Sequence, residues 1–596
     1  MVNLVRPNMK AMKGQTSVKG SMHWMKYLLR DIKTYFKTIW IFVAPMLLLP
    51  LALLTGREGR CAYCIFLISC YWVAEVVPLA VTALLPVVLM PALSVAPIQK
   101  IARAYLSETN MMFLSTLMLS LAVEECQLHK RFALKMLTLV GARPQWLLAG
   151  FMCITTFISL WISDTACAAL MSPIAFALLE SMMIHKMTPS QNTSKKTNDL
   201  ELEDSAGRET KYTPQSLEFS RLPKRDRGIC KCLMLIVAHA SLIGGTGTIN
   251  STAPNLIFRS TLFEYFPGED TGITYLSWMT FAIPPMIACM MASWLIVQLQ
   301  FVGLHHVLGV FAKPTEEEKA DERRVRKTVE TAYSELGAIT FGEISTLVIF
   351  TLTIFSWITR DPKVIQGWAI FFKHGYVTDA CTGILAVFIL FIWPREMPDF
   401  FFLRPKSERN RFPIKRDAIL TWDAVRRRFP WSVILLLGSG FAVAESVKES
   451  GLSSLLACQL QSLLSNLPQA VMQIIISIAA VTISGFTTNT ATASIVIPIV
   501  FDVAIRMQIH PLYLSLAAAI GPSYSFMFPM SSPPNAIVYD TGAVSMMDMA
   551  SSGLLLNIAC ILITVVNLNT WSYWLFSMNT YPGYALRYNS TSRCAL

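Results

Sequence analysis

The sequence has little charge. Asp, Glu, Lys and Arg make up 15% of its 596 residues, apolar residues make up 54%, and the mean hydropathy is +0.49. A soluble protein of this size would carry more charge, so this composition indicates a chain that crosses a membrane many times. The net charge of +12 does not indicate nucleic-acid binding, because most Lys and Arg lie between apolar runs, where cytoplasmic loops collect them.

The sequence also lacks the patterns of several functional classes. The 13 cysteines show neither metal-ligand spacing nor an extracellular disulfide framework, so we expect small buried side chains. No Gly-Lys-Ser/Thr follows the glycines at 244–247, which excludes a phosphate-binding loop. Asp164, Asp379 and Asp540 lie in or near apolar segments, but the Gly-x-Gly-Asp signature of an intramembrane protease is absent. We therefore expect no enzyme and no cofactor.

Alternating apolar and charged stretches predict the topology. The first apolar run, at 39–54, follows a basic segment and precedes no small-residue cleavage site, so it is expected to remain as an anchor. The basic residues of 1–38 and of 404–428 place both segments in the cytosol. The sequon at Asn589 fits a glycosylated, extracellular C-terminus, which requires an odd number of spans, about eleven. Spans or half-spans are expected at 39–55, 61–77, 78–94, 111–126, 132–150, 232–248, 275–301, 343–358, 376–393, 431–448, 469–484, 485–507, 511–530 and 553–578.

These expectations divide the chain into seven parts. The membrane-embedded parts carry the apolar runs, and the parts between and around them are polar or charged. The divisions are a cytosolic tail at 1–38, a first membrane part at 39–185, a polar cytosolic loop at 186–231, the rest of a first repeat at 232–311, a charged cytosolic connector at 312–342, a second repeat at 343–578 and an extracellular tail at 579–596.

Two clusters of small polar residues interrupt the apolar runs. Ser163-Asp164-Thr165-Ala166 is followed by Pro173-Ile174, and Thr488-Asn489-Thr490-Ala491 is followed by Pro498-Ile499 at the same spacing. Hydroxyls and amides removed from water inside a bilayer cost several kcal/mol each unless something binds them. We therefore expect the clusters to form one composite site for a ligand or ion. The interrupted run at 147–184 predicts a broken helix or re-entrant hairpin.

Two further matches follow the same order in both halves. Ala122-Val123-Glu124 resembles the segment 442–445, and Pro254-Asn255-Leu256-Ile257 resembles the segment 534–537. Weak symmetry at interrupted segments indicates a secondary transporter built from repeats, with its site at their interface. Neither motif contains Arg or Lys, so helix N-termini, hydroxyls and bound cations would have to hold an anion. That arrangement predicts obligatory coupling to a cation such as sodium.

Several stretches together resemble one known family. They include Trp161-Ile162-Ser163-Asp164-Thr165, Gly244-Gly245-Thr246-Gly247-Thr248, Tyr376-Val377-Thr378-Asp379-Ala380, Ser532-Pro533-Pro534-Asn535, and the segments 71–82, 128–134 and 431–438. From about residue 40 to 580 the chain resembles the divalent anion:sodium symporters, the animal di- and tricarboxylate and sulfate cotransporters. The resemblance implies an all-α polytopic fold of about 11 transmembrane helices, two re-entrant hairpins and two inverted repeats. It also implies an elevator-type homodimer with a scaffold domain and a mobile transport domain.

The resemblance further implies the roles of individual residues. It places one sodium among Ser159, Asp164 and the backbone of Gly245, Thr246 and Gly247, and another among Ser484, Thr487, Asn489 and Ser531. The residues implied to face the substrate are Ser163, Asp164, Thr165, Thr488, Asn489, Thr490, Ser532 and Pro533. The alternative for the hydroxyls is a hydrogen bond to the preceding helical turn.

Two positions depart from the family pattern. Thr488 stands where the family usually has Ser, which keeps the hydroxyl and should have a modest effect. Asp164 stands where the first motif has Asn, so an amide that can donate to a carboxylate is replaced by an acceptor that is anionic when ionised. This exchange argues against ordinary transport of trivalent anions.

The sequence thus predicts a plasma-membrane, sodium-coupled symporter that imports dicarboxylates such as succinate, or citrate. The segment 245–248 looks more like the carboxylate transporters than the sulfate transporters. A sulfate symporter is the first alternative. A transport-impaired membrane sensor or scaffold is the second, because of Asp164. We expect a homodimer in contact with lipid, with sodium as the coupling ion and no nucleic-acid partner.

Overall fold

The computed structural model describes residues 34–586 except 55, 75, 141–143, 188–222, 304–315, 362–365, 374–375, 400–411, 413–415 and 465–466. The predictions for residues 1–33, most of the polar loop and Asn589 lie outside this part of the chain. Within the described ranges the fold is helical, and Pro394 and Ala418 form an isolated β-bridge instead of a strand. The helices of the first half are α2 (Phe36–Leu54), α3 (Gly56–Ala74), α4 (Leu79–Thr82), α5 (Leu85–Ala92), α6 (Ile98–Tyr105), α7 (Glu108–Glu125), α8 (Leu128–Val140), α9 (Pro144–Ser159), α10 (Asp164–Met187), α11 (Lys224–Gly245), α12 (Ala253–Tyr265), α13 (Tyr275–Phe301) and α15 (Glu316–Glu335).

The second half also consists of long and short helices. In the described part of this half, the short 3-10 turns η3, η5 and η6 lie among them. In order they are α16 (Phe341–Arg360), η3 (Trp368–Phe371), α17 (Asp379–Ile392), α18 (Trp422–Arg428), α19 (Trp431–Ser450), α20 (Leu452–Leu464), α21 (Gln469–Phe486), α22 (Asn489–Arg506), α23 (Pro511–Ile520), η5 (Gly521–Ser523), η6 (Pro529–Ser531), α24 (Pro533–Asp540), α25 (Met546–Asn569), α26 (Trp571–Leu575) and α27 (Gly583–Leu586).

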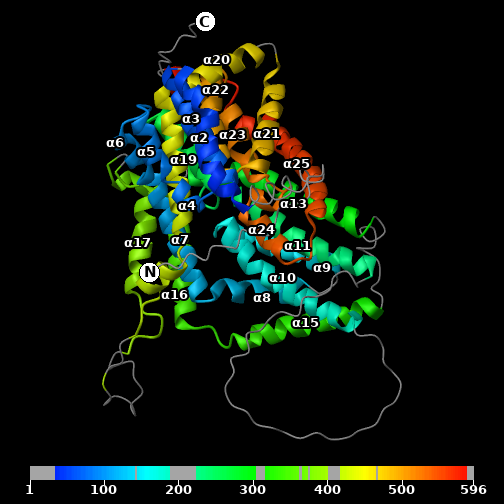
Figure 1. Cartoon of the computed structure of the whole chain (residues 1–596). Coiled ribbons are helices and arrows are strands. Elements are labelled where there is room, and N and C mark those ends of the chain that lie inside the picture. Colours follow the sequence, from blue (N-terminus) through cyan, green and yellow to red (C-terminus); the bar gives the residue numbers. More distant parts are fainter. Residues whose placement is uncertain are drawn as a thin grey trace, which may run out of the picture.

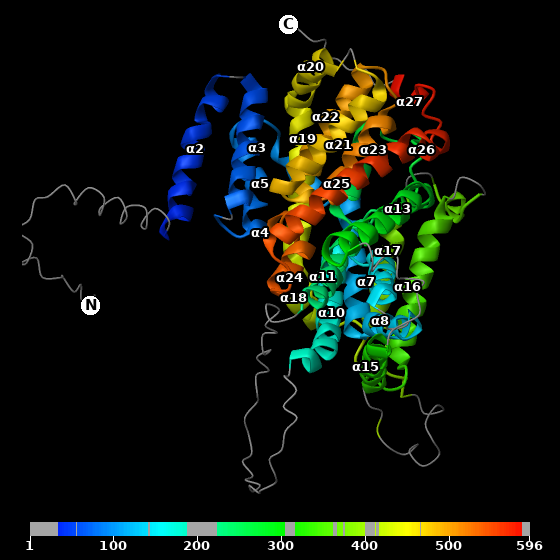
Figure 2. The same cartoon turned by 90° about the vertical axis from the view of Figure 1, so that its right-hand side faces the viewer.

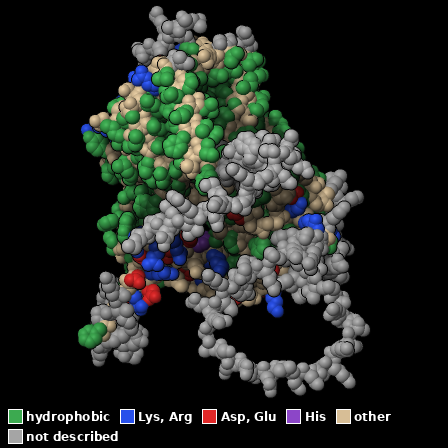
Figure 3. Space-filling model, viewed as in Figure 1, with side chains coloured by type: hydrophobic (Ala, Val, Ile, Leu, Met, Phe, Trp, Pro, Cys, Tyr) green, Lys and Arg blue, Asp and Glu red, His purple; other side chains and the backbone are tan. Residues whose placement is uncertain are grey.

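The helices form a membrane protein with many spans. Nine helical segments among the described residues are long and apolar enough to cross a bilayer, and three shorter apolar helices accompany them. Apolar side chains cover the upper part of the face shown in Figure 3, and Lys and Arg gather beneath it. The finer expectation, about eleven spans plus two hairpins, stays a prediction, because length and composition do not separate a span from a hairpin arm.

Two helical hairpins approach each other from opposite ends of the molecule. In the first, residues 160–163 join α9 to α10; in the second, Thr487 and Thr488 join α21 to α22. Figures 1 and 2 place the second hairpin toward the end where α20 lies, and the first toward the end where α8 and α15 lie. Both polar motifs therefore lie at hairpin turns, with each motif beginning a helix.

The structure corrects the expected span at 132–150. Residues 128–140 instead form α8, which lies across the long helices beside α15 in Figure 1, and Pro144 begins α9. The charged side chains of α8 explain this position, because Lys130, Arg131 and Lys135 would be costly inside hydrocarbon. Arg131 ties α8 to the start of α16 through Glu343, with Nε and Oε1 2.7 Å apart.

Three other expectations also change. α11 begins at Lys224, so the polar loop ends before residue 231, because the helix continues beyond its apolar part. Helix α12 was not predicted, although Pro254 stands in its first turn, where a proline favours a helix start. Cys458 in α20 is disulfide-bonded, contrary to the expectation that no cysteine is. Most other described cysteines are buried, as expected.

Candidate functional site

The first group of oxygen atoms lies where α9 ends, α10 begins and α11 ends. The Ser159 hydroxyl donates to the Ser241 carbonyl at 2.6 Å. A Cβ placed on Gly245 would lie 3.6 Å from the Asp164 Cβ and 3.9 Å from the Ser159 Oγ. The structure thus brings together Ser159, Asp164 and Gly245, three of the residues predicted to surround a sodium. We call this group, with the unwound segment 246–252, the Asp164 cluster.

The unwound segment between α11 and α12 is held by side-chain hydrogen bonds to its own backbone. Ser251 Oγ and Asn255 Nδ2 donate to the Gly245 carbonyl at 2.7 and 3.2 Å, and Asn255 also donates to the Thr248 carbonyl at 2.8 Å. Thr248 Oγ1 donates to the Leu160 carbonyl at 2.7 Å, which ties this segment to the hairpin turn. These bonds fix the directions of the remaining backbone groups.

Thr246 and Gly247 are less available than predicted. Thr246 Oγ1 donates back to the Ile243 carbonyl at 2.7 Å, and its own carbonyl accepts from Trp278 Nε1 at 3.1 Å. Gly247 packs tightly, because an added Cβ would lie 2.3 Å from a Leu160 methyl. A sodium ligand from this pair would have to be a backbone carbonyl. The Thr246 carbonyl would then bind the ion while it also accepts from Trp278.

The second group lies where α21 ends, α22 begins and α23 unwinds into η5. Asn489 Oδ1 accepts from the hydroxyls of Ser484 and Ser525, both at 2.9 Å, and Ser484 also approaches the Pro522 carbonyl at 2.7 Å. Ser531 Oγ donates to the Ser525 carbonyl at 2.9 Å, as Asn535 Nδ2 does at 2.6 Å. Ser484 and Ser531 are buried, and Asn489 is half-buried. We call this group the Asn489 cluster.

Thr487 does not join the Asn489 cluster in this structure. Its hydroxyl donates to the Ile483 carbonyl at 2.9 Å and lies 2.7 Å from Thr492 Oγ1. Both contacts belong to its own hairpin. Its predicted role as a sodium ligand would therefore need a different side-chain rotamer or its backbone carbonyl.

The two clusters use matching hydrogen bonds. In each cluster, a serine of the hairpin, Ser159 or Ser484, donates to a backbone carbonyl near the C-terminal end of α11 or α23. The asparagine of a Pro-Asn pair holds the unwound segment that follows that helix. Besides the exchange of Asn489 for Asp164, they differ at Ser525, where the first cluster has Gly245. Asn489 receives a hydroxyl from Ser525, whereas Asp164 has Gly245 beside it and accepts from its neighbour Thr165 through the amide and hydroxyl, at 2.7 and 3.2 Å.

The residues predicted to face the substrate lie at helix starts. Ser163 and Thr488 accept from the backbone amides of Ala166 and Ala491, at 3.4 and 3.2 Å, and thus cap α10 and α22. Ser532, just before α24, is 3% exposed, and its hydroxyl has no hydrogen-bond partner. A buried hydroxyl without a partner costs free energy unless a ligand or water binds it, so Ser532 supports the predicted site. Thr165 and Thr490 lie in the first turns of α10 and α22, and Pro533 begins α24 with its ring exposed.

Helix packing brings elements of the two halves into contact. α10 packs against α24, and α12 packs against α22. Each hairpin helix therefore contacts the helix that follows the other half's unwound segment. α11 also packs against α24 and η5, so it contacts elements of the Asn489 cluster. The predicted composite site stays a prediction, and this packing supports it.

Arg259, a buried arginine on α12, is already paired. Arg259 Nη2 lies 2.8 Å from Asp379 Oδ2, and Arg360 Nε lies 2.6 Å from the other oxygen of the same carboxylate. Asp379 is 1% exposed. Because both guanidinium groups contact this one buried carboxylate, the ion pair holds Arg259 in the fold. The described residues also contain no group of three or more His, Cys, Asp or Glu side chains placed to hold a metal ion.

The sequence analysis missed Ser525 and the structural part played by the two asparagines. Asn255 and Asn535 hold their unwound segments through paired carbonyl contacts. A signal for them was present, since the Pro-Asn dipeptide occurs in both halves at 254–255 and 534–535. No such signal existed for Ser525, because its counterpart is a glycine.

Similarity to known proteins identifies the family of this chain. Residues 31–578 match the family described as the sodium:sulfate symporter transmembrane region. The chain belongs to the divalent anion:sodium symporter family. This symporter is 57% identical to an uncharacterized transporter of Caenorhabditis elegans over 94% of its own length and 96% of that protein. It is 41% identical to the sodium-dependent high-affinity dicarboxylate transporter 2 of C. elegans, covering 92% and 96%, and 38% identical to the human Na(+)/dicarboxylate cotransporter 3, covering 92% and 94%.

Two neighbouring glycines of the symporter test how tightly the Asp164 cluster is packed. A Cβ on Gly244 would lie 2.8 Å from the Thr156 carbonyl, whereas a Cβ on Gly245 meets nothing closer than 3.6 Å. Gly244→Ala should therefore separate α9 from α11 and destabilise the protein by about 1–3 kcal/mol. Gly245→Ala should fold normally. Thermal unfolding of the two purified variants checks this, and equal midpoints would contradict the packing described.

Proposed function

We propose that this protein is a sodium-coupled symporter that imports dicarboxylates such as succinate, and citrate as a further substrate. The observation that carries the proposal is the pair of matching oxygen clusters at two hairpin turns, in a chain whose relatives include sodium-dependent dicarboxylate transporters. Sodium is a hard cation that takes oxygen ligands, and unwound carbonyls next to helix ends are the usual ligands in secondary transporters.

The Asn489 cluster offers a neutral set of sodium ligands. The Asn489 side-chain oxygen and the Pro522 carbonyl both face the Ser484 hydroxyl, and the Ser525 carbonyl faces the Ser531 hydroxyl; these hydroxyls can rotate when an ion arrives. The Asp164 cluster offers a carboxylate in place of the amide. We infer that both clusters bind sodium and that the Asp164 cluster binds it with the additional attraction of a negative charge.

The anion would bind between the starts of α10, α22 and α24. The first amides of a helix carry partial positive charge and unsatisfied N–H groups, which suit a carboxylate. These helix starts carry the hydroxyl residues Ser163, Thr488 and Ser532. The Ser532 hydroxyl has no hydrogen-bond partner within the protein. Sodium on either side would offset the substrate charge, which explains why the transporter needs no free Arg or Lys at the site.

We further propose two inverted repeats that move as an elevator. The matching hydrogen bonds of the two clusters and the opposite entry of the hairpins support the repeats. The orientation follows from charge and redox chemistry: the Arg-rich helix α18 belongs to the cytosol, and the disulfide-bonded Cys458 of α20 belongs to an oxidising, extracellular side. A plasma-membrane homodimer remains part of the same proposal.

Uptake of labelled anions into expressing cells tests this function. Succinate uptake in sodium, and little in choline, is expected, with citrate a weaker substrate because Asp164 opposes its third charge. Sulfate uptake exceeding that of succinate would favour the sulfate symporter. Correctly localised protein without uptake of any of the three would favour the sensor or scaffold.

Removing one cap hydroxyl from each motif tests whether the site is composite. Ser163→Ala and Thr488→Ala should each raise both the succinate and the sodium concentrations needed for half-maximal uptake, because ions and anion share ligands and their binding is reciprocally linked. The cost of a cap, about 1 kcal/mol, predicts an effect of roughly fivefold. Thr482→Ala is the control, since Thr482 is an exposed residue of the same hairpin. Sodium-independent, undiminished uptake by both site variants would reject the composite site.

A further inference from the structure

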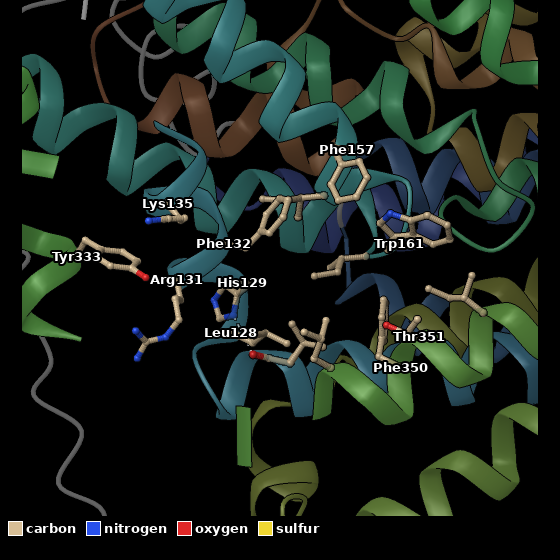
Figure 4. A pocket seen from close by; sticks show the side chains of 15 residues that line it. Leu128, His129, Arg131, Phe132, Lys135, Phe157, Trp161, Tyr333, Phe350 and Thr351 are labelled. Carbon is tan, nitrogen blue, oxygen red and sulfur yellow. Dashed lines mark hydrogen bonds between the residues drawn. The ribbon is translucent and has the colours of Figure 1, made fainter. Parts of the chain in front are cut away.

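A cavity separate from the two clusters lies between α16 and the first hairpin. Its volume is about 480 Å³, within the range of ligand pockets. Most of its wall is apolar and comes from α8, α9, the hairpin turn and α16, while α15 contributes Tyr333. Figure 4 shows Phe132, Phe157 and Trp161 facing Phe350 and Thr351 across it. The three aromatic rings of the first wall touch in sequence, with centroids 5.3 and 6.3 Å apart.

One end of this cavity is basic. His129, Arg131 and Lys135 lie there with Tyr333, and the described residues that line the cavity include no Asp or Glu (Figure 4). Arg131 is held by Glu343 and by the carbonyls of residues 336–338, and its guanidinium lies 5.8 Å from the centre of the Tyr333 ring. Lys135, one turn further along α8, is exposed and lies 5.5 Å from the same ring. A ligand that fits both ends has an apolar chain and an anionic head.

The cavity adjoins a surface that faces lipid. Next to its lining residues, α16 exposes Val348, Leu352 and Phe355, with exposed fractions of 50–62%. Phe157 in the opposite wall is itself 47% exposed, so the cavity reaches the surface. The basic end lies toward α8 and α15, at the end of the molecule assigned to the cytosol. Anionic phospholipids are concentrated in the cytoplasmic leaflet and bind basic pockets between membrane helices.

We propose that an anionic phospholipid of the cytoplasmic leaflet binds this cavity, with an acyl chain between α9 and α16 and its headgroup at Lys135. The occupant would contact Trp161 and Ile162, which directly precede Ser163 and Asp164. It would therefore stabilise the hairpin turn in the position it has here, and would favour the transporter state that contains the cavity. The effect on transport and the choice of leaflet rest on the proposed function and orientation, but the binding of an anionic phospholipid to the cavity does not.

Photolabelling tests the binding directly. The purified full-length protein is placed in vesicles that contain phosphatidylserine or phosphatidylcholine with the same photoreactive acyl chain, or the corresponding free fatty acid. Phosphatidylserine should label peptides of α9 and α16 most strongly. Thr351→Trp should remove this labelling by filling the cavity, and Leu352→Trp, on the lipid-facing side of the same helix, should not. Lys135→Gln should weaken phosphatidylserine labelling about fivefold, whereas Lys327→Gln, on exposed α15, should leave it unchanged.

Three outcomes would overturn the proposal. They are equal labelling by phosphatidylserine and phosphatidylcholine, undiminished labelling of Thr351→Trp, and stronger labelling by the free fatty acid than by either phospholipid. Sodium-dependent uptake is measured in the same vesicles and should respond to phosphatidylserine in the natural protein but not in Thr351→Trp. Labelling without any uptake would reject the proposed function and leave the lipid site standing.

Discussion

Replacing Asn489 with Ala is expected to abolish sodium-dependent uptake at ordinary sodium concentrations. The side-chain oxygen of Asn489 is the acceptor shared by Ser484 and Ser525, and Ala leaves both hydroxyls without it. Ser484 keeps the Pro522 carbonyl as an acceptor, but the buried Ser525 hydroxyl loses its partner, which costs about 1–3 kcal/mol, and a sodium bound as proposed would lose a ligand as well. The sodium concentration for half-maximal uptake should rise at least tenfold, as measured by titrating sodium against labelled succinate.

Asn489→Asp is the matched comparison for this variant. Aspartate keeps the accepting oxygen and reproduces the chemistry found at Asp164, so this variant should still use sodium while losing affinity for the more highly charged substrates. Surface labelling must show that both variants reach the cell surface. Normal sodium activation of Asn489→Ala would mean that the Asn489 cluster binds no coupling ion.

Replacing Asp164 with Asn is expected to change how transport depends on pH. An ionised carboxylate held away from water is costly once its sodium leaves, so a proton can take the place of the ion. Its charge also repels a nearby substrate carboxylate, so the anion should bind best when Asp164 is paired with sodium or protonated. Uptake by the natural protein should therefore rise as external pH falls, beyond the effect of substrate protonation. Asp164→Asn should remove that excess and should improve affinity for citrate relative to succinate.

The measurement needs a substrate that does not titrate, and sulfate meets that condition where it is transported. Parallel pH profiles of sulfate uptake for the natural protein and Asp164→Asn would show that Asp164 stays in one protonation state. Its contacts with the amide and hydroxyl of Thr165 would then be its main role. Gly245→Ser provides a second comparison, because an added side chain would lie beside Asp164 as Ser525 lies beside Asn489.

The sequence was sufficient for the helical membrane class, the two hairpin motifs and the family. Those features depend on local composition and on short motifs that recur in order. It was misleading at α8, where an apolar average concealed Lys130, Arg131 and Lys135. It also could not identify Ser525, whose contact with Asn489 joins residues 36 positions apart. Nor could it identify the pairing of Arg259 with Asp379, which lie 120 positions apart. Thr487 and Thr246 show a further limit, since a motif does not reveal which way a hydroxyl turns.

The difference between Gly245 and Ser525 bears on the order of events in a transport cycle. The Asp164 cluster is a charged site with few hydroxyl donors, whereas the Asn489 cluster is neutral and already satisfied by its own hydrogen bonds. If both clusters bind sodium as proposed, a cation that reaches the empty protein gains more at the charged site, and we expect that site to fill first. The Asn489 cluster must break the hydrogen bonds from Ser484 and Ser525 before it can accept an ion. We therefore expect it to fill later, together with the substrate. The residues at positions 245 and 525 would thus set the order of binding in the transport cycle, with one sodium bound early and the other late.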